Sequence, residues 1–495
     1  MERSNPFKTM NFRKTAISGV KWTSFGTIGR SLFQLLQISI LTRFLPKEAF
    51  GLVAMALFVV QFSNIFVDMG MASAILHRQN ATKNEYSSIY WLNIFISLFL
   101  YGILFISTPF VSRFYNEPEL LTLIPILATN LLLMASGRQH RTIMQKQFQF
   151  KAIALTELIS FLIGLIAAIL LAINDFGVYS LVYSTLLSSF ISNSLFLVQN
   201  LRLNPIRFHF RISETKPFLK IGGYTMGSSL LDFFSHEIDI LIIGKMLGAE
   251  SLGVYSLAKQ IVLKLFSIIN PIVVSVLSPL LSSIQKEKQR LKVTYLKVVN
   301  YLAYINFPIY VLVIVASKEI LHIVYGAAYA ESYVILSFLA FSYCLTALSN
   351  PVGSLQIATG RTDIGFKWTI FRVITTTPVI FAGALISIEA VAAFYAILSL
   401  IYILPLWLIQ LKPMANIKLK EYVKQFDKPF LFFLGATLII YLLGDKTEIT
   451  NNIITNAIIK VSVTVVAFAL FVISFDKKSV SEIYKLFTST IKRNK

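Results

Sequence analysis

About fourteen long apolar runs divide the sequence, and they constrain the fold more than any other feature. A hydrocarbon core about 30 Å thick needs about 20 mostly apolar residues in an α-helix. Of the 495 residues, 56% are hydrophobic and only 14% are charged, against about 25% charged in a typical soluble protein. The sequence therefore predicts an all-α polytopic membrane protein with about 14 transmembrane helices. The runs lie near 18–41, 50–76, 87–111, 119–137, 152–173, 177–199, 218–243, 252–281, 298–316, 332–358, 366–386, 388–410, 429–443 and 453–474.

Lysine and arginine give the chain a net charge of +21, and they gather in alternate loops. The N-terminal arm, the alternate loops and the tail hold roughly 33 of them, whereas the opposite side holds about 6. Because positively charged loops stay in the cytoplasm, both termini are predicted to be cytoplasmic. This bias explains the basic composition without nucleic acid, which we do not expect as a partner. Anionic membrane lipids are the expected neighbours of these loops.

The loops on the outer side are short, and the longest, around 316–332, has fewer than about 20 residues, too few for a separate domain. Function is therefore expected within the membrane. No Walker A pattern or HExxH motif occurs, and Cys344 is the only cysteine. We predict no ATP-driven mechanism, no metal site, no cofactor and no enzymatic activity.

A near copy of the stretch at 40–56 occurs 202 positions later. The same offset places the first two apolar runs on the seventh and eighth, and an even number of spans separates them, so the copies are parallel repeats. We predict a six-helix lobe over 1–200, a pseudo-symmetric six-helix lobe over 216–411, two C-terminal helices over 428–475 and a basic cytoplasmic tail over 476–495. The aligned pairs are Arg43 with Lys245, Leu45 with Leu247, Glu48 with Glu250, Gly51 with Gly253 and Ala56 with Ala258.

Both copies also resemble a known family. The segment SILTRFLPKEAFGLVAMALFVVQFSNIFVDMGMASAIL looks like the first hairpin of the polysaccharide-export flippases of the multidrug/oligosaccharidyl-lipid/polysaccharide superfamily. The segment EIDILIIGKMLGAESLGVYSLAKQIV resembles the start of their second lobe. The resemblance covers nearly the full chain and is closer to the Wzx-type flippases of lipid-linked sugar repeats than to drug exporters. It implies two lobes that give alternating access to a central cavity.

Five basic residues within the apolar runs are candidates for substrate binding. An ionisable side chain at mid-bilayer costs at least about 2.5 kcal/mol, so it usually faces a cavity or a partner. By the resemblance, their helices line the central cavity, where Arg and Lys would bind the phosphates of a polyprenyl pyrophosphate. The five are Arg30, Lys264, Lys21, Lys259 and Arg372.

Each of these assignments has an alternative. Arg30 and Lys264 lie about 18 Å along their helices, and structural pairing is the alternative to substrate contact. Lys21 and Lys259 lie nearer the interfaces and can extend toward water instead. Lys21 and Arg30 are nine residues apart, so they face one cavity only if the GTIGR segment bends.

Acidic and titratable residues in the seventh run are candidates for gating or ion coupling. Asp232, His236 and Asp239 recur at i, i+4 and i+7 and are expected on one helix face. His236 can titrate near neutral pH, which suits ion coupling. The 202-residue offset sets Asp232 opposite Arg30, so a salt bridge that closes a gate is the alternative. Asp68 belongs to the same candidate set, although structural pairing is favoured for it.

Proline residues inside the runs are candidate hinges, because proline removes a helical hydrogen bond and bends a helix. The preferred hinge is Pro271, which follows Asn270. The 202-residue offset relates Asn270 to Asp68, so Pro271 corresponds to the position directly after Asp68.

Together these features predict a secondary transporter that flips a polyprenyl-pyrophosphate-linked oligosaccharide to the outer leaflet of a bacterial inner membrane. The expected partners are that lipid, membrane lipids, a coupling proton or sodium ion, and the polymerase and glycosyltransferases of the same pathway. One alternative is a small-molecule antiporter of the same superfamily, whose cavity would be more aromatic and acidic. Another is a membrane glycosyltransferase or polymerase, for which a sizeable outer loop would be expected.

Overall fold

The computed structural model describes residues 12–78, 80–201, 204–443, 450 and 452–475. Every regular element in this part of the chain is a helix. Ten helical segments there are long and apolar enough to cross a membrane. The all-α polytopic membrane fold is thereby confirmed, while the number of fourteen spans stays a prediction. The basic tail predicted over 476–495 lies outside the described residues.

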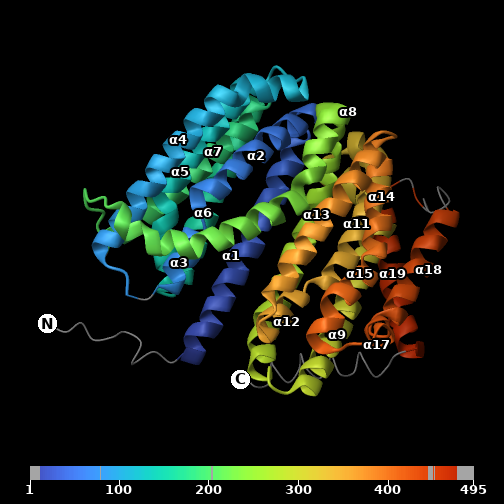
Figure 1. The fold of residues 1–495 in the computed structure, drawn as a ribbon. Helices are drawn as coiled ribbons and strands as arrows, with labels where there is room; N and C mark the ends of the chain where they lie inside the picture. The colour runs from blue at the N-terminus through green and yellow to red at the C-terminus, as the bar shows by residue number, and fades with distance from the viewer. Residues whose placement is uncertain (1–11, 79, 202–203, 444–449, 451, 476–495) are drawn as a thin grey trace. The chain divides into compact units, whose positions relative to one another are not determined.

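The chain forms two compact units, Met1–Gly253 and Val254–Lys495. This boundary follows packing, and the division into repeats at residues 200 and 216 stays a prediction. In the first unit, α1 packs on α6, α5 packs on α4 and α7, and α2 packs on α4 and α5 (Figure 1). Its helices are α1 (Phe12–Leu41), α2 (Lys47–Asp68), α3 (Met71–His77), α4 (Lys83–Tyr115), α5 (Leu120–Lys146), α6 (Phe150–Ile173), α7 (Tyr179–Leu201) and the first arm of α8 (Ile212–Ser283).

Local sequence signals fix where several of these helices begin and end. Thr82 starts α4 with a capping box, in which its side chain accepts from the Glu85 backbone and the Glu85 carboxylate accepts from the Thr82 backbone. The second apolar run forms two helices, because Met69 and Gly70 both adopt positive φ angles, 41° and 65°. Gly248 also has a positive φ angle, 81°, and interrupts α8 in its middle.

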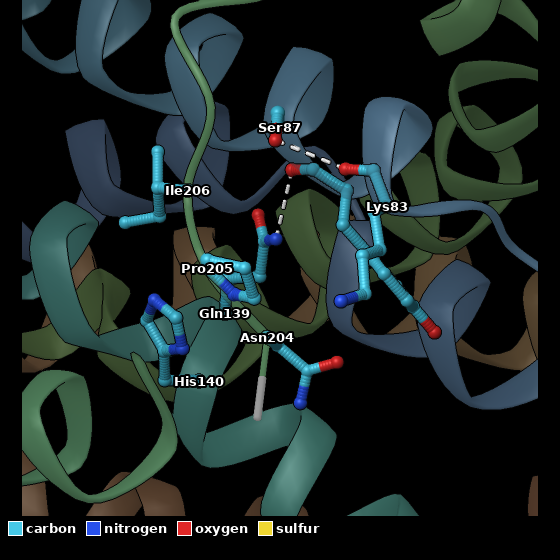
Figure 2. A pocket seen from close by; sticks show the side chains of 8 residues that line it. Lys83, Ser87, Gln139, His140, Asn204, Pro205 and Ile206 are labelled. Carbon is cyan, nitrogen blue, oxygen red and sulfur yellow. Dashed lines mark hydrogen bonds between the residues drawn. The ribbon is translucent and has the colours of Figure 1, made fainter. Parts of the chain in front are cut away.

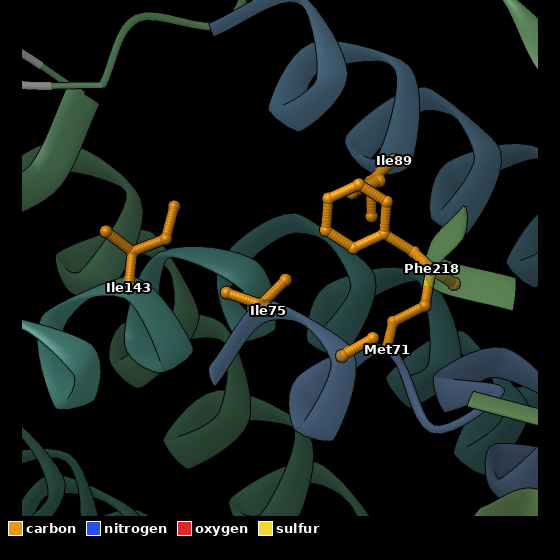
Figure 3. Close-up of a cluster of buried hydrophobic side chains, with 6 residues drawn as sticks. Met71, Ile75, Ile89, Ile143 and Phe218 are labelled. Carbon is orange, nitrogen blue, oxygen red and sulfur yellow. The ribbon is translucent and has the colours of Figure 1, made fainter. Parts of the chain in front are cut away.

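A buried apolar cluster joins α3, α4, α5 and the start of α8 within the first unit. Phe218, the first large aromatic residue of α8, is fully buried against side chains of the other three helices. Figure 3 shows its ring beside Ile89, with Met71 and Ile75 below it and Ile143 beyond Ile75. Close packing of these side chains gives van der Waals contact along the whole interface. The cluster therefore fixes the start of α8 to the first unit.

The two copies of the repeated stretch meet within the first unit, through two glycines. A Cβ atom at Gly51 of α2 would overlap the carbonyl oxygen of Ala249, and a Cβ atom at Gly253 would overlap that of Lys47. Both glycines are buried. The two contacts are exchanged by the 202-residue offset, since Lys47 corresponds to Ala249 and Gly51 to Gly253. Only glycine allows the backbones to come this close.

The second unit begins in the second arm of α8. In this unit α11 packs on α9 and α14, α13 packs on α14, and α18 and α19 pack on α9. Its further elements are α9 (Lys288–Val315), α10 (Ser317–Tyr325), η2 (Ala327–Ser332), α11 (Tyr333–Ser349), α12 (Val352–Thr359), α13 (Thr362–Ala384), α14 (Ile388–Ile401), α15 (Ile403–Leu406), η3 (Trp407–Leu411), α16 (Lys412–Ala415), α17 (Leu419–Val423), α18 (Asp427–Leu443) and α19 (Ile453–Phe475).

A buried ion pair fastens the last described helix to the rest of the second unit. Lys460 of α19 lies 2.5 Å from Glu319 of α10, whose side chain is 2% exposed. Within the described residues, the second carboxylate oxygen of Glu319 has no hydrogen-bond partner. A buried carboxylate that relies on one cation makes this contact costly to break.

Candidate functional site

Three arginines and two carboxylates meet inside the first unit, and we call this group the arginine cluster: Arg30 of α1, Asp68 of α2, Arg138 and Arg141 of α5, and Glu157 of α6. Glu157 Oε1 accepts from Nε of Arg141 at 2.8 Å and lies 2.8 Å from its Nη2. Its other oxygen lies 3.7 Å from Nη1 of Arg30, beyond hydrogen-bond length. Glu157 therefore holds Arg141 firmly and Arg30 loosely.

The second half of the cluster pairs Asp68, the last residue of α2, with Arg138. The distance from Arg138 Nη1 to Asp68 Oδ1 is 3.4 Å, and both side chains are partly buried. Arg138 and Arg141 are three residues apart and so occupy neighbouring positions on one helix face. Two carboxylates thus stand among three guanidinium groups.

The cluster carries surplus positive charge and has open donors. Arg30 and Arg141 keep about 40% of their side chains exposed, whereas Glu157 is 16% exposed. Within the described part of the chain, the Arg30 guanidinium donates no hydrogen bond. Guanidinium groups match phosphate and carboxylate oxygens in charge and geometry. The arrangement can therefore accept an additional anion at Arg30.

The other predicted residues of the first unit lie in different surroundings. α1 is one continuous helix through the GTIGR segment, so Lys21 and Arg30 lie on opposite sides of it, and the Lys21 side chain is exposed. Asp232 and His236 are exposed, whereas Asp239 is buried and its carboxylate accepts from the Ile240 backbone at 2.9 Å. The roles assigned to these residues stay predictions.

In the second unit, Lys259 is buried and Lys264 is partly buried, both on the second arm of α8. Arg372 of α13 lines a recess that is described below. Pro271 lies within a helical stretch of that arm, whereas the non-helical residue of α8 is Gly248. The hinge at Pro271 stays a prediction, and so do the substrate contacts of the three cations.

Sequence reasoning missed Arg138 and Arg141 as members of the site. The fourth apolar run was expected to end at residue 137, which placed both arginines in a cytoplasmic loop as topology signals. Instead α5 continues to Lys146, and both side chains point to carboxylates of neighbouring helices. The available signal was the presence of Asp68 and Glu157 within apolar runs, because such carboxylates need cationic partners.

A small polar recess lies beside α5 in the same unit (Figure 2), between the start of α4 and the segment that follows α7. His140 is 1% exposed there, and within the described residues neither ring nitrogen has a hydrogen-bond partner. Gln139 donates to the carbonyl oxygen of Tyr86 at 2.8 Å. The enclosed space of about 10 Å³ has the size of one water molecule. This recess is too small for a sugar or a phosphate.

Comparison with known proteins places this chain in a family. Residues 40–334 match the family model described as "Polysaccharide biosynthesis protein". The chain belongs to the polysaccharide biosynthesis protein family. One similar protein is the teichuronic acid biosynthesis protein TuaB of Bacillus subtilis, which is 30% identical over 88% of this chain and 90% of that protein. The lipopolysaccharide biosynthesis protein WzxC of Escherichia coli is 25% identical over 88% of this chain and 89% of that protein.

Solved structures show the same fold for this member of the polysaccharide biosynthesis protein family. The lipid II flippase MurJ, in an inward closed conformation, matches with a TM-score of 0.74 over 94% of this chain and 100% of that chain, at 16% identity. An inward-facing multidrug transporter of the MATE family matches with a TM-score of 0.61 over 83% of this chain and 96% of that chain, at 15% identity. These two matches show the fold, and the resemblance to polysaccharide-export proteins is confirmed by the family match and the relatives.

Proposed function

We propose that this protein is a secondary transporter that flips a polyprenyl-pyrophosphate-linked oligosaccharide across the bacterial inner membrane by alternating access. Membership of the polysaccharide biosynthesis protein family supports the substrate class. The observation that carries the mechanism is the arginine cluster, where Arg30 has open donors among partly exposed guanidinium groups. A pyrophosphate that leaves water needs such donors to replace its lost hydration.

Arg30 is the member of the cluster that would contact the pyrophosphate first. Arg138 and Arg141 are already paired with carboxylates at 3.4 and 2.8 Å. These pairs would hold the two carboxylates away from the ligand, so the surplus positive charge of the cluster stays at Arg30. A second binding contribution from Lys264 or Lys259, and coupling to a proton or sodium ion through Asp232, His236 or Asp239, belong to the same proposal.

A leaflet assay tests the proposal directly. The protein is reconstituted into vesicles with a fluorescent polyprenyl-pyrophosphate oligosaccharide, and flipping is followed by loss of access to a membrane-impermeant quencher. Arg30→Gln should slow flipping about tenfold or more, because a hydrogen bond to a charged group contributes about 1.5–3 kcal/mol. Arg30→Lys should retain part of the rate, since the charge stays while the planar fork is lost.

Arg290→Gln is the matched control, since Arg290 of α9 is an exposed arginine that pairs with Glu287 one turn away. It should flip the lipid at the rate of the unmodified protein. If Arg30→Gln also flips at that rate, with equal reconstitution, the phosphate role of the cluster is wrong. If the unmodified protein moves cationic dyes but not the lipid, the antiporter alternative replaces the proposal.

A further inference from the structure

A recess in the second unit, separate from the arginine cluster, has the chemistry of a ligand site. It lies among α11, α13, α14 and α15, with Tyr422 of α17 contributing to its wall. The enclosed space is about 40 Å³, and the whole recess with its open mouth is about 490 Å³. The enclosed space is four times that of the recess beside α5, and the open mouth lets a ligand extend beyond it. The wall residues that matter here are Ser349, Trp368, Arg372, Tyr395, Ser399 and Tyr402.

One wall of the recess is aromatic and held in place. The Trp368 ring packs edge-on against Tyr402 at 5.6 Å and stacks on Phe371 at 5.6 Å. The Tyr402 hydroxyl forms hydrogen bonds with the hydroxyls of Thr375 and Thr376 at 2.6 and 2.7 Å. These contacts hold Trp368 and Tyr402 in fixed orientations, so the wall is preorganised for the C–H face of a ring.

Arg372 is the one charged residue that lines this recess in the described part of the chain. Its side chain is partly buried on α13. Among the described residues, no carboxylate pairs with its guanidinium, which also donates no hydrogen bond to them. A partly buried guanidinium group without a counter-charge can bind an oxyanion through two parallel hydrogen bonds.

We infer that this recess binds a sugar ring that bears an oxyanion, as part of the lipid-linked substrate. The carboxylate or phosphate of the sugar would pair with Arg372. The ring would lie against Trp368 and Tyr402, and its hydroxyls would reach Ser349 and Ser399. The inference rests on the proposed function, and it adds that the protein selects a charged sugar unit over a neutral one.

The test is saturation-transfer NMR on the full chain in nanodiscs, with soluble sugars as probes. Glucuronate represents a sugar carboxylate, and glucose 1-phosphate represents a sugar phosphate. Two control probes are glucose, which has the ring without the oxyanion, and inorganic phosphate, which has the oxyanion without the ring. We expect signals from at least one charged sugar, and at least about tenfold weaker signals from glucose and from phosphate alone. Which charged sugar binds identifies the oxyanion.

Variants of Arg372 and Trp368 separate the contribution of the positive charge from that of the aromatic wall. Arg372→Gln should abolish discrimination between charged and neutral sugars, whereas Arg372→Lys should retain part of it. Trp368→Leu should weaken all sugars and leave inorganic phosphate unchanged, and Trp368→Phe should restore most of the binding. Arg290→Gln, which is exposed on α9, is the control for loss of a positive charge.

Three outcomes would overturn the inference: no signal from either charged sugar, equal binding of glucose, or phosphate binding that does not depend on Arg372. None of these results requires transport, so sugar binding can fail while the leaflet assay succeeds. Conversely, if the recess binds charged sugars but the protein flips no lipid, the proposed function is refuted while the recess remains a binding site for charged sugars.

Discussion

Among single residues, the position of Glu157 decides how much positive charge the arginine cluster offers to a ligand. Its carboxylate holds Arg141 at 2.8 Å and Arg30 at only 3.7 Å. One guanidinium is therefore fixed, while the donors of the other stay open. A carboxylate placed symmetrically between the two would take hydrogen bonds from both and leave Arg30 fewer open donors for an anion.

Glu157→Gln is expected to destabilise the first unit. The substitution keeps the shape but removes the charge that holds Arg141 in a partly buried position, at a cost of about 1–3 kcal/mol. Thermal unfolding in detergent, followed by intrinsic fluorescence, measures the change. Glu287→Gln is the control, because its pair with Arg290 is exposed and should contribute little. Equal melting temperatures for the two variants would contradict this account.

A second residue-scale prediction concerns pH and the segment between α7 and α8. Glu214 accepts from the Ser88 hydroxyl at 2.6 Å and contacts His209 at 2.9 Å. The Ser88 hydrogen bond, followed by that of His209, lowers the pKa of Glu214 below its ordinary 4.5. The stabilising contribution is thus complete above about pH 4.5 and is lost as the pH falls through the lowered value.

Hydrogen exchange of residues 204–214 between pH 3 and 7, corrected for intrinsic rates, measures this loss. Ser88→Ala removes the larger cause of the shift, so the pKa of Glu214 should rise and protection should fall at a higher pH than in the unmodified protein. An identical pH midpoint in the two proteins would mean that Ser88 does not stabilise the charged carboxylate.

Between elements, the crossing of α2 and α8 depends on two residues without side chains. Gly51→Ala places a methyl group where the Ala249 carbonyl oxygen lies, and a backbone group cannot rotate away as a side chain can. Destabilisation of about 1–3 kcal/mol or more is expected. Gly102→Ala in α4 is the control, because nothing lies within 4 Å of its Cβ position. It should raise stability by about 0.5–1 kcal/mol.

Denaturant unfolding of both variants measures the difference. If Gly51→Ala is as stable as Gly102→Ala, the two backbones are not closely packed at this crossing. Gly253→Ala should behave like Gly51→Ala, since its Cβ would meet the Lys47 carbonyl in the corresponding way.

The sequence predicted where most helices lie, because bilayer thickness and helical rise leave little choice. It could not predict interruptions that depend on one backbone angle. Gly248 turns α8 with a single residue where a longer polar loop was expected, and Met69 breaks the second run although methionine favours helices. Side-chain partners were also out of reach, because the contact of Arg141 with Glu157 depends on the packing of α5 beside α6.

At the scale of the whole molecule, the remaining question is which side of the membrane each loop faces. The bias of Lys and Arg predicts that the turn between α4 and α5 faces outward and the turn between α8 and α9 faces the cytoplasm. Alkaline phosphatase fused at Asn116 should be active, and the same fusion at Gln285 should be inactive. A green fluorescent protein fused after the last residue should fluoresce. The opposite pattern would reverse the direction of transport.

The exchange of contacts between Gly51 and Gly253 has a consequence for the origin of the chain. Gly51 of the first copy contacts Ala249 of the second, and Gly253 of the second copy contacts Lys47 of the first. The offset relates Gly51 to Gly253 and Lys47 to Ala249, so the same contact is made twice with the copies exchanged. This is the rule of an isologous interface between identical subunits related by a two-fold axis. A protein of half this length, carrying the first copy alone, would possess both sides of the contact. Duplication and fusion of such a half-length chain would produce an internal crossing of this form.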